Sequence, residues 1–187
     1  PEPEEVPPGQ PLEGEADACL DGSWLRVAGE RLLEVDQLAL AGRHNQANVL
    51  AAALAARELG AATGAMAGAL RTFAGLPHRH RTVHVAAGVR WVDDSKATNV
   101  GATLAGLRGY GDGAVHLVLG GQAKGQDFEP LVAVVARAAA RVYVIGVDGD
   151  RIGDALAEAV PVERCGRLDE AVRRARAHVR AGQTVLL

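Results

Sequence analysis

Short apolar runs alternate with helix-like segments through the second half of this 187-residue chain, and this alternation most constrains the fold. The clearest run, at 115–119, reads Val-His-Leu-Val-Leu and ends in two glycines, as is typical of a buried parallel strand. Strands that alternate with helices predict an α/β fold, here a Rossmann-like, mostly parallel sheet with helices on both faces. We predict strands at 83–85, 89–92, 115–119, 142–145, 161–163 and 184–187, and helices at 100–107, 129–139, 150–159 and 168–180.

The first part of the chain has a different pattern. Two β-prone runs, 24–27 and 31–35, flank a glycine-containing turn and predict a hairpin. Ala-rich helices are predicted at 44–59 and 63–73, and Pro77 follows, which disfavours helix at the residue before it. We expect residues 1–76 and 77–187 to belong to different domains. Since the second part stops at a strand, we also expect the chain to be a fragment.

Composition disfavours several classes of protein. The net charge of −3 lacks the basic stripe of a nucleic-acid-binding domain, and no apolar run approaches the roughly 20 residues of a membrane span. Cys19 and Cys165 stand alone, which indicates incidental thiols in a reducing cytosol. The histidines form no HExxH motif. We therefore expect no nucleic-acid partner, no membrane insertion and no metal site made by this chain alone.

The segment 94–99 reads Asp-Ser-Lys-Ala-Thr-Asn and lies between a predicted strand and a predicted helix. Parallel α/β domains bind ligands at the carboxyl ends of their strands. The same residue types are the usual helix caps, and Thr98 in particular could be only an N-cap. The segment therefore predicts either a ligand-binding turn or an ordinary helix N-cap with polar neighbours.

A glycine-rich turn, GGQAKG, follows the run 115–119. Glycines at the end of a strand let an anion approach the backbone, and Lys124 could hold a carboxylate or a phosphate. A solvated lysine beside a structural turn is the alternative. The turn matches neither the Walker A pattern GxxxxGK[ST] nor GxGxxG.

Asn45 and Asn48 follow His44 at the start of the helix predicted at 44–59. Residues three apart are neighbours on a helix surface, so the two amides lie close together. They could cap the helix or read the edge of a purine ring.

The order of these segments is more specific than any one of them. The chain shows GxHNxxN from Gly42, GLPHR from Gly75, WxDDSKATN from Trp91 and LGGxxKGxDF from Leu119. This order resembles the Mur ligases of peptidoglycan synthesis, and the DSKATN form favours the branch that adds D-glutamate. The resemblance runs from near Ser23 to the last residue.

The resemblance implies a multidomain enzyme of which this chain is the C-terminal portion. Residues 1–76 would be the remnant of a central P-loop ATPase domain, namely a hairpin and helices. Residues 77–187 would be most of a Rossmann-like amino-acid-binding ligase domain, truncated at its C-terminal end.

The activity implied by the resemblance is that of an ATP-dependent acid–amino-acid ligase. The full-length enzyme would add D-glutamate to UDP-N-acetylmuramoyl-L-alanine (UDP-MurNAc-L-Ala) through an acyl phosphate, as a cytoplasmic monomer that uses ATP and Mg²⁺. The P-loop and the magnesium ligands would lie outside this chain, so the fragment alone is expected to be inactive.

For the nucleotide, the resemblance implies that Asn48 contacts the adenine, with Asn45 and His44 supporting the helix start. Arg79 would reach the ribose and phosphates of ATP, although a surface interdomain salt bridge is an alternative for this residue. Asp94 would accept hydrogen bonds from the ribose hydroxyls or pair with Arg79.

For the amino acid, the resemblance implies that Thr98 and Lys124 hold the D-glutamate carboxylates. Lys96 would lie at the boundary between nucleotide and amino acid, which makes Lys96 and Arg79 the catalytic candidates. Two other functions stay open: another Mur-type or folylpolyglutamate-type ligase, and a non-catalytic Rossmann-like binding module.

Overall fold

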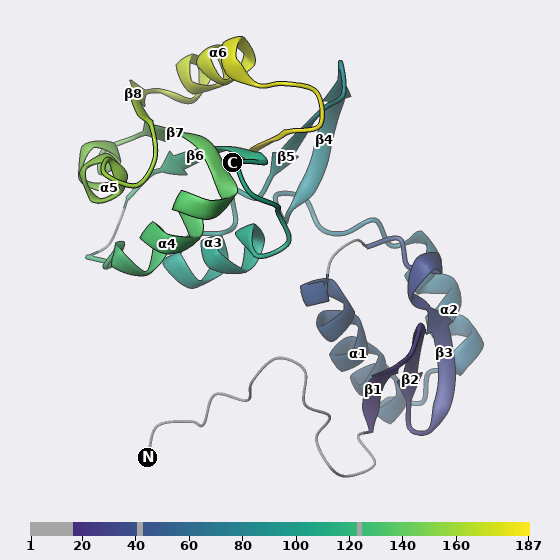
Figure 1. Ribbon diagram of the computed structural model, residues 1–187. Helices are drawn as coiled ribbons and strands as arrows, with labels where there is room; N and C mark the ends of the chain where they lie inside the picture. The colour runs from purple at the N-terminus through teal and green to yellow at the C-terminus, as the bar shows by residue number, and fades with distance from the viewer. Residues whose placement is uncertain (1–16, 41–42, 123–124) are drawn as a thin grey trace. The chain divides into compact units, whose positions relative to one another are not determined.

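The computed structural model describes residues 17–40, 43–122 and 125–187. They divide into two compact units, one that ends at Ala74 and one that begins at Gly75 (Figure 1). Each unit has its own apolar core, and we describe each by itself.

The first unit packs two helices against a small antiparallel sheet. Its strands are β1 (Ala18–Asp21), β2 (Trp24–Val27) and β3 (Glu30–Glu34), in that order, followed by the 3₁₀ helix η1 (Val35–Gln37). Helices α1 (Arg43–Glu58) and α2 (Thr63–Thr72) bury one side of this sheet in a shared core of small and aliphatic residues. The predicted hairpin is present, and β1, which the sequence did not predict, adds a third strand to it.

A charged cluster ties β3 to both helices. Arg57 of α1 donates to Glu30 at 2.9 Å, and the Thr63 hydroxyl at the start of α2 donates to the same carboxylate at 2.7 Å. The hydrogen bond from Arg57 is the largest of the effects that lower the pKa of Glu30 to about 2. The carboxylate therefore stays charged wherever this unit is folded near neutral pH.

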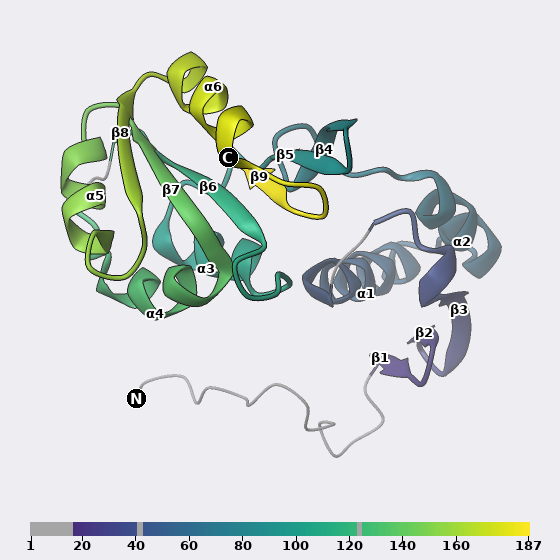
Figure 2. The same ribbon diagram turned by 45° about the horizontal axis from the view of Figure 1, so that its top comes forward.

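The second unit is built on a six-stranded sheet in the order β4-β5-β9-β6-β7-β8 (Figures 1 and 2). Among the described strands of this sheet only β4 and β5 pair antiparallel, so the predicted mostly parallel sheet is confirmed. The last strand is inserted between β5 and β6, which do not pair with each other. The strands are β4 (Arg81–Ala86), β5 (Val89–Asp93), β6 (Val115–Gly120), β7 (Ala139–Ile145), β8 (Val162–Gly166) and β9 (Thr184–Leu186).

Helices cover both faces of this sheet, as the alternation predicts (Figure 2). Helices α3 (Val100–Leu107), α4 (Glu129–Ala138) and α5 (Gly149–Leu156) lie on one face, and α6 (Leu168–His178) lies on the other. Successive strand residues point to opposite faces of the sheet. Leu117 therefore packs in the core beneath α3, α4 and α5, and Val118 packs in the core beneath α6. Burial on both faces explains why β6 and β7 read as nearly continuous apolar runs.

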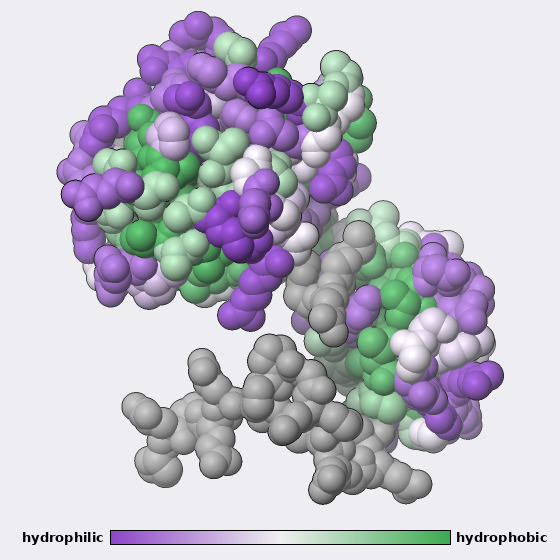
Figure 3. All heavy atoms as spheres, viewed as in Figure 1, coloured by the Kyte–Doolittle hydropathy of each residue, from purple (hydrophilic) through white to green (hydrophobic). Residues whose placement is uncertain are grey.

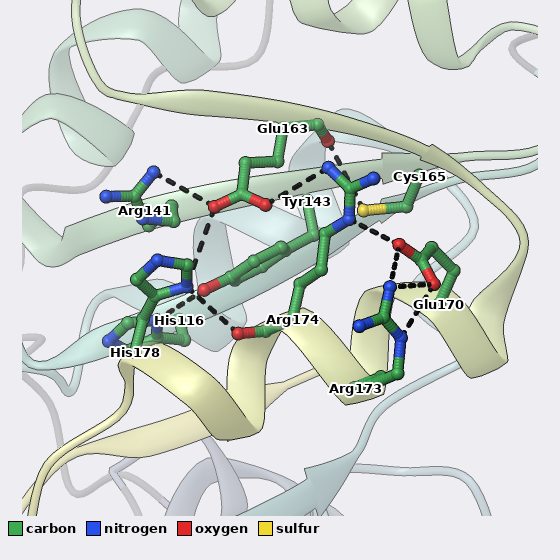
Figure 4. A network of polar contacts seen from close by, with 9 residues as sticks. All are labelled: His116, Arg141, Tyr143, Glu163, Cys165, Glu170, Arg173, Arg174 and His178. Atoms are coloured by element: carbon green, nitrogen blue, oxygen red, sulfur yellow. Dashed lines mark hydrogen bonds and ion pairs between the residues drawn. The ribbon is translucent and has the colours of Figure 1, made fainter.

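A polar network fastens α6 to the sheet (Figure 4). Glu163 of β8 accepts a hydrogen bond from Arg141 of β7 at 3.0 Å and pairs with Arg174 of α6 at 3.4 Å. His116 Nδ1 lies 2.9 Å from the Tyr143 hydroxyl. Burial lowers the pKa of His116 and raises the pKa of Tyr143 to about 12. The charged and polar side chains of this network bond to one another, so we interpret the network as structural.

Hydrophilic residues cover much of the viewed face of each unit, with hydrophobic residues showing between them (Figure 3). Among the described residues, no helix combines the length and apolar character needed to cross a membrane.

Gly120 lets the ends of β6 and β7 approach closely. A Cβ atom at this position would clash with the main chain of Ile145. We predict that Gly120→Ala lowers the free energy of unfolding by about 1–3 kcal/mol, because overpacking forces the backbone apart. Chemical denaturation followed by tryptophan fluorescence measures this change.

Gly109→Ala is the matched control, since no heavy atom lies within 4 Å of a Cβ built there. Its effect should stay within about 0.5 kcal/mol. Equal stabilities of the two variants would contradict the close approach.

Candidate functional site

A cavity of about 500 Å³ lies at the carboxyl edge of the second unit's sheet. Thr98 and Asn99 of the β5–α3 turn line it, together with Gly121 and Gln126 of the loop after β6. Apolar side chains from the core beneath α3, α4 and α5, Phe128 among them, complete the lining. Parallel α/β proteins bind small ligands at this edge, so the cavity is the candidate site.

Main-chain hydrogen bonds fix the start of the 94–99 turn. The Asp94 N–H donates to the Leu187 carbonyl at 2.7 Å, and the Ala97 N–H donates to the Asp94 carbonyl at 2.7 Å. The Lys96 N–H donates to the His78 carbonyl at 3.0 Å. The turn is therefore joined to the residue after β9 and to the segment that precedes β4.

Two histidines contact the two aspartates at the end of β5. His78 Nδ1 lies 2.7 Å from an Asp93 carboxylate oxygen. Burial acts to raise the pKa of Asp93, but hydrogen bonds from Ser95 and His78 outweigh it and hold that pKa below its ordinary value. Asp93 is therefore a charged structural anchor for the turn.

Asp94 is held by His80. The His80 N–H donates to Asp94 Oδ1 at 2.9 Å, and His80 Nδ1 lies 3.2 Å from Asp94 Oδ2. The Tyr110 hydroxyl lies 3.1 Å from His80 Nε2. The described contacts of the Asp94 carboxylate are thus with His80 and not with Arg79, although Asp94 does line the cavity.

Asn99 and Gln126 fix the end of the turn. Asn99 is the N-cap of α3, because its Oδ1 accepts from the Ala102 N–H at 2.9 Å. The Gln126 side chain accepts from the Val100 N–H at 2.9 Å and donates to the Thr98 carbonyl at 3.4 Å. Thr98 is exposed and is not the cap, so the interpretation of Thr98 as only an N-cap is wrong.

The predicted site residues fall into three groups. Asp94 and Thr98 come together at the cavity. Arg79 and Lys96 are exposed, do not line the cavity, and make no side-chain hydrogen bond or ion pair within the described part of the chain. Lys124, which was expected to bind a carboxylate, lies outside the described residues.

The two asparagines belong to the other unit. Both lie on α1, where Asn48 is exposed and Asn45 is half-buried with a partner of its own. The side chain of His44 lies outside the described residues. The cavity in the second unit therefore does not test the roles expected for these residues.

His80, Tyr110, Asn99 and Gln126 were not among the site residues predicted from the sequence. Gln126 gave no signal, since it contacts a turn that lies 26 residues earlier in the chain. Asn99 stood inside the predicted turn, but an asparagine beside a threonine leaves the choice of cap open. His80 was visible only as a neighbour of Arg79.

No group of three or more His, Cys, Asp or Glu side chains gathers around a possible metal position within 17–40, 43–122 and 125–187. The two aspartates of the turn are already engaged by histidines.

The chain matches a family model described as "Mur ligase, glutamate ligase domain" over residues 78–187. A UDP-N-acetylmuramoylalanine–D-glutamate ligase of Chromohalobacter salexigens is 44% identical over 167 residues, which are 88% of this chain and 37% of that protein. The enzyme of the same name from Pseudomonas aeruginosa is 46% identical over the same shares. The chain thus spans little more than a third of the length of these relatives.

Solved structures share the fold at lower identity. A bifunctional folylpolyglutamate synthase/dihydrofolate synthase of Yersinia pestis superposes with a TM-score of 0.65 at 18% identity, over 90% of this chain and 41% of that one. The UDP-N-acetylmuramate–alanine ligase MurC of Thermotoga maritima gives a TM-score of 0.61 at 19% identity, over 87% and 38%.

The cap assignment predicts different effects for two neighbouring residues. Asn99→Ala should lower the free energy of unfolding by about 1 kcal/mol, because the first turn of α3 loses its acceptor. Thr98→Ala should change it by less than about 0.5 kcal/mol, because this exposed hydroxyl caps nothing. Thermal or chemical denaturation measures both, and a larger loss at Thr98 would contradict the assignment.

Proposed function

This chain belongs to the Mur ligase family, and on that premise we propose that the full-length protein is an ATP-dependent ligase that joins D-glutamate to UDP-MurNAc-L-Ala. One observation carries the proposal. Relatives that bear the name UDP-N-acetylmuramoylalanine–D-glutamate ligase are 44–46% identical over 88% of the chain. The position of the DSKATN turn at the carboxyl-edge cavity supports it.

We assign residues 77–187 to the amino-acid-binding ligase domain and residues 1–76 to the end of the ATPase domain. The division of the described residues into two compact units supports separate roles. The remainder of the full-length protein would supply the P-loop and the ligands of Mg²⁺, which neutralises phosphate charge during phosphoryl transfer.

The proposed reaction joins two anionic substrates in two steps. A carboxylate oxygen of UDP-MurNAc-L-Ala attacks the γ-phosphorus of ATP and releases ADP, which gives an acyl phosphate. The D-glutamate amine then attacks the acyl carbon, loses a proton and expels inorganic phosphate as the amide forms. Positioning and neutralisation of negative charge dominate such chemistry.

Arg79 and Lys96 are the cations that we assign to this task. Both are exposed and neither has an ion-pair partner in the described part of the chain, which supports roles toward a ligand. We place Arg79 at the ribose and phosphates of ATP and Lys96 between the nucleotide and the amino acid.

Asp94 and Thr98 are the described acceptor and hydroxyl at the cavity. An ionised carboxylate offers about four acceptor positions, so Asp94 can accept from a ribose hydroxyl while His80 occupies other positions. We assign Thr98 and Lys124 to the carboxylates of D-glutamate. We assign Asn48 to the adenine, with Asn45 supporting it, and place the monomeric protein in the cytoplasm, where ATP is available.

The decisive test uses the full-length protein with ATP, Mg²⁺ and UDP-MurNAc-L-Ala. Phosphate release should depend on D-glutamate and should be much slower with L-glutamate, L-alanine or diaminopimelate. Preference for another amino acid would assign the protein to another ligase of the family. Release that no amino acid stimulates would favour a binding module and contradict the proposal.

The assignment of Lys124 predicts a selective defect. Lys124→Ala should raise the KM for D-glutamate about tenfold or more, since a hydrogen bond to a charged group contributes about 1.5–3 kcal/mol. The KM for ATP should change less. Steady-state kinetics measure both constants, with Lys124→Arg as the charge-retaining control. An unchanged KM for D-glutamate would reject the role.

A further inference from the structure

The segment before β4 holds two histidines in an unusual backbone conformation. His78 and His80 have φ angles of 63° and 48°, in the left-handed region, and Arg79 lies between them. Non-glycine residues rarely adopt this region, and they persist there only where the surroundings fix them. The contacts of His80 show what fixes it.

His80 contacts both oxygens of the Asp94 carboxylate. Its N–H donates to one oxygen of Asp94 at 2.9 Å, and its Nδ1 faces the other oxygen at 3.2 Å. The N–H and the ring of His80, whose backbone is left-handed, thus face the same carboxylate. Both oxygens of Asp94 are thereby oriented by a single residue.

Tyr110 fixes the ring from its other side. Its hydroxyl lies 3.1 Å from His80 Nε2, so a neutral imidazole can accept from Tyr110 and donate from Nδ1 to Asp94. Gly106 of α3 leaves the necessary space, since a Cβ there would lie 3.2 Å from Asp94 Oδ2 and 3.6 Å from His80 Nδ1. The Asp94 carboxylate thus lies between the 78–80 segment and α3, and Tyr110, just after α3, contacts the ring of His80.

The contacts of His80 differ from those of a buried structural histidine. A histidine and a tyrosine also meet at His116 and Tyr143, but His116 is only 3% exposed and lies in the network beneath α6. The side chains of His80 and Asp94 are 23% and 17% exposed, and Asp94 lines the cavity. The His80 contacts therefore orient a carboxylate that a ligand can reach.

We propose that His80, backed by Tyr110, is a positioning residue that fixes the Asp94 carboxylate and the backbone carrying Arg79 for the ribose and phosphates of the nucleotide. This inference rests on the proposed function, which assigns Asp94 and Arg79 to ATP. Orienting both groups before the nucleotide arrives reduces the ordering that binding would otherwise require.

The test compares two replacements that both tolerate a left-handed backbone. Asparagine and glycine are the residues that adopt this conformation most readily, but only asparagine keeps a donor near the position of Nδ1. In the full-length enzyme, His80→Gly should raise the KM for ATP about tenfold through the lost charge-assisted contact. His80→Asn should keep that KM within about threefold of the wild type, and the KM for D-glutamate should change less than about twofold in both variants.

Tyr110→Phe provides a second measurement that does not alter the turn. It should raise the KM for ATP by about threefold, because the ring of His80 loses its contact with the Tyr110 hydroxyl. If His80→Gly does not fold, this variant decides the question. His84→Ala, which removes an exposed histidine from β4, is the matched control and should behave as the wild type.

Failure of the positioning role and failure of the ligase function give different results. Equal KM values for ATP in the His80→Asn and His80→Gly variants would overturn the positioning role while leaving the ligase assignment intact. A parallel rise in the KM values for ATP and D-glutamate would also overturn it. Wild-type protein that releases no phosphate in response to D-glutamate would overturn the proposed function, and the role of His80 with it.

Discussion

Strand β9 (Thr184–Leu186) holds the second unit together. Its three residues are buried, and they pair with β5 on one side and with β6 on the other. Because β5 and β6 do not pair directly, β9 is the only described strand that links the β4–β5 hairpin to the rest of the sheet. This central position of the sheet is therefore filled by a strand whose partners lie far away in sequence.

The candidate site depends on that pairing. The residue after β9 accepts the hydrogen bond from the Asp94 N–H, so the turn begins where β5 and β9 end together. His80 orients the carboxylate at this end, and Asn99 and Gln126 fix the other end at the start of α3. Thr98 lies between these anchors with its carbonyl held and its side chain exposed. A turn fixed at both ends and open in the middle suits a ligand that must be positioned against a second reactant.

The sequence predicted the architecture because burial on two faces produces continuous apolar strands, and helices alternate with them. It missed β1, whose four residues are half-buried or exposed and carry no apolar alternation. Element ends shifted by a few residues: α5 ends at Leu156 instead of 159, and β8 runs to Gly166 instead of 163. Such boundaries depend on caps and pairing partners that a local pattern does not contain.

The sequence also indicated the edge of the sheet at which the candidate cavity lies, since ligands bind where parallel strands end. The internal contacts of the site were not predictable. Neighbouring Thr98 and Asn99 are both capping types, and only the geometry of α3 selects Asn99. His80 contacts Asp94 from a left-handed backbone conformation, which a histidine rarely adopts and which its residue type does not predict. Gln126 reaches the turn only because α4 and α3 lie side by side on one face of the sheet.

In the proposed enzyme, the 94–99 turn separates the bound nucleotide from the amino acid. A crystal structure of the full-length protein with ADP and D-glutamate bound would show this separation. We expect a ribose hydroxyl within hydrogen-bond distance of Asp94, about 2.5–3.0 Å, and an amino-acid carboxylate at a similar distance from the Thr98 hydroxyl. Either ligand bound away from the carboxyl edge of this sheet, or both on the same side of the turn, would contradict it.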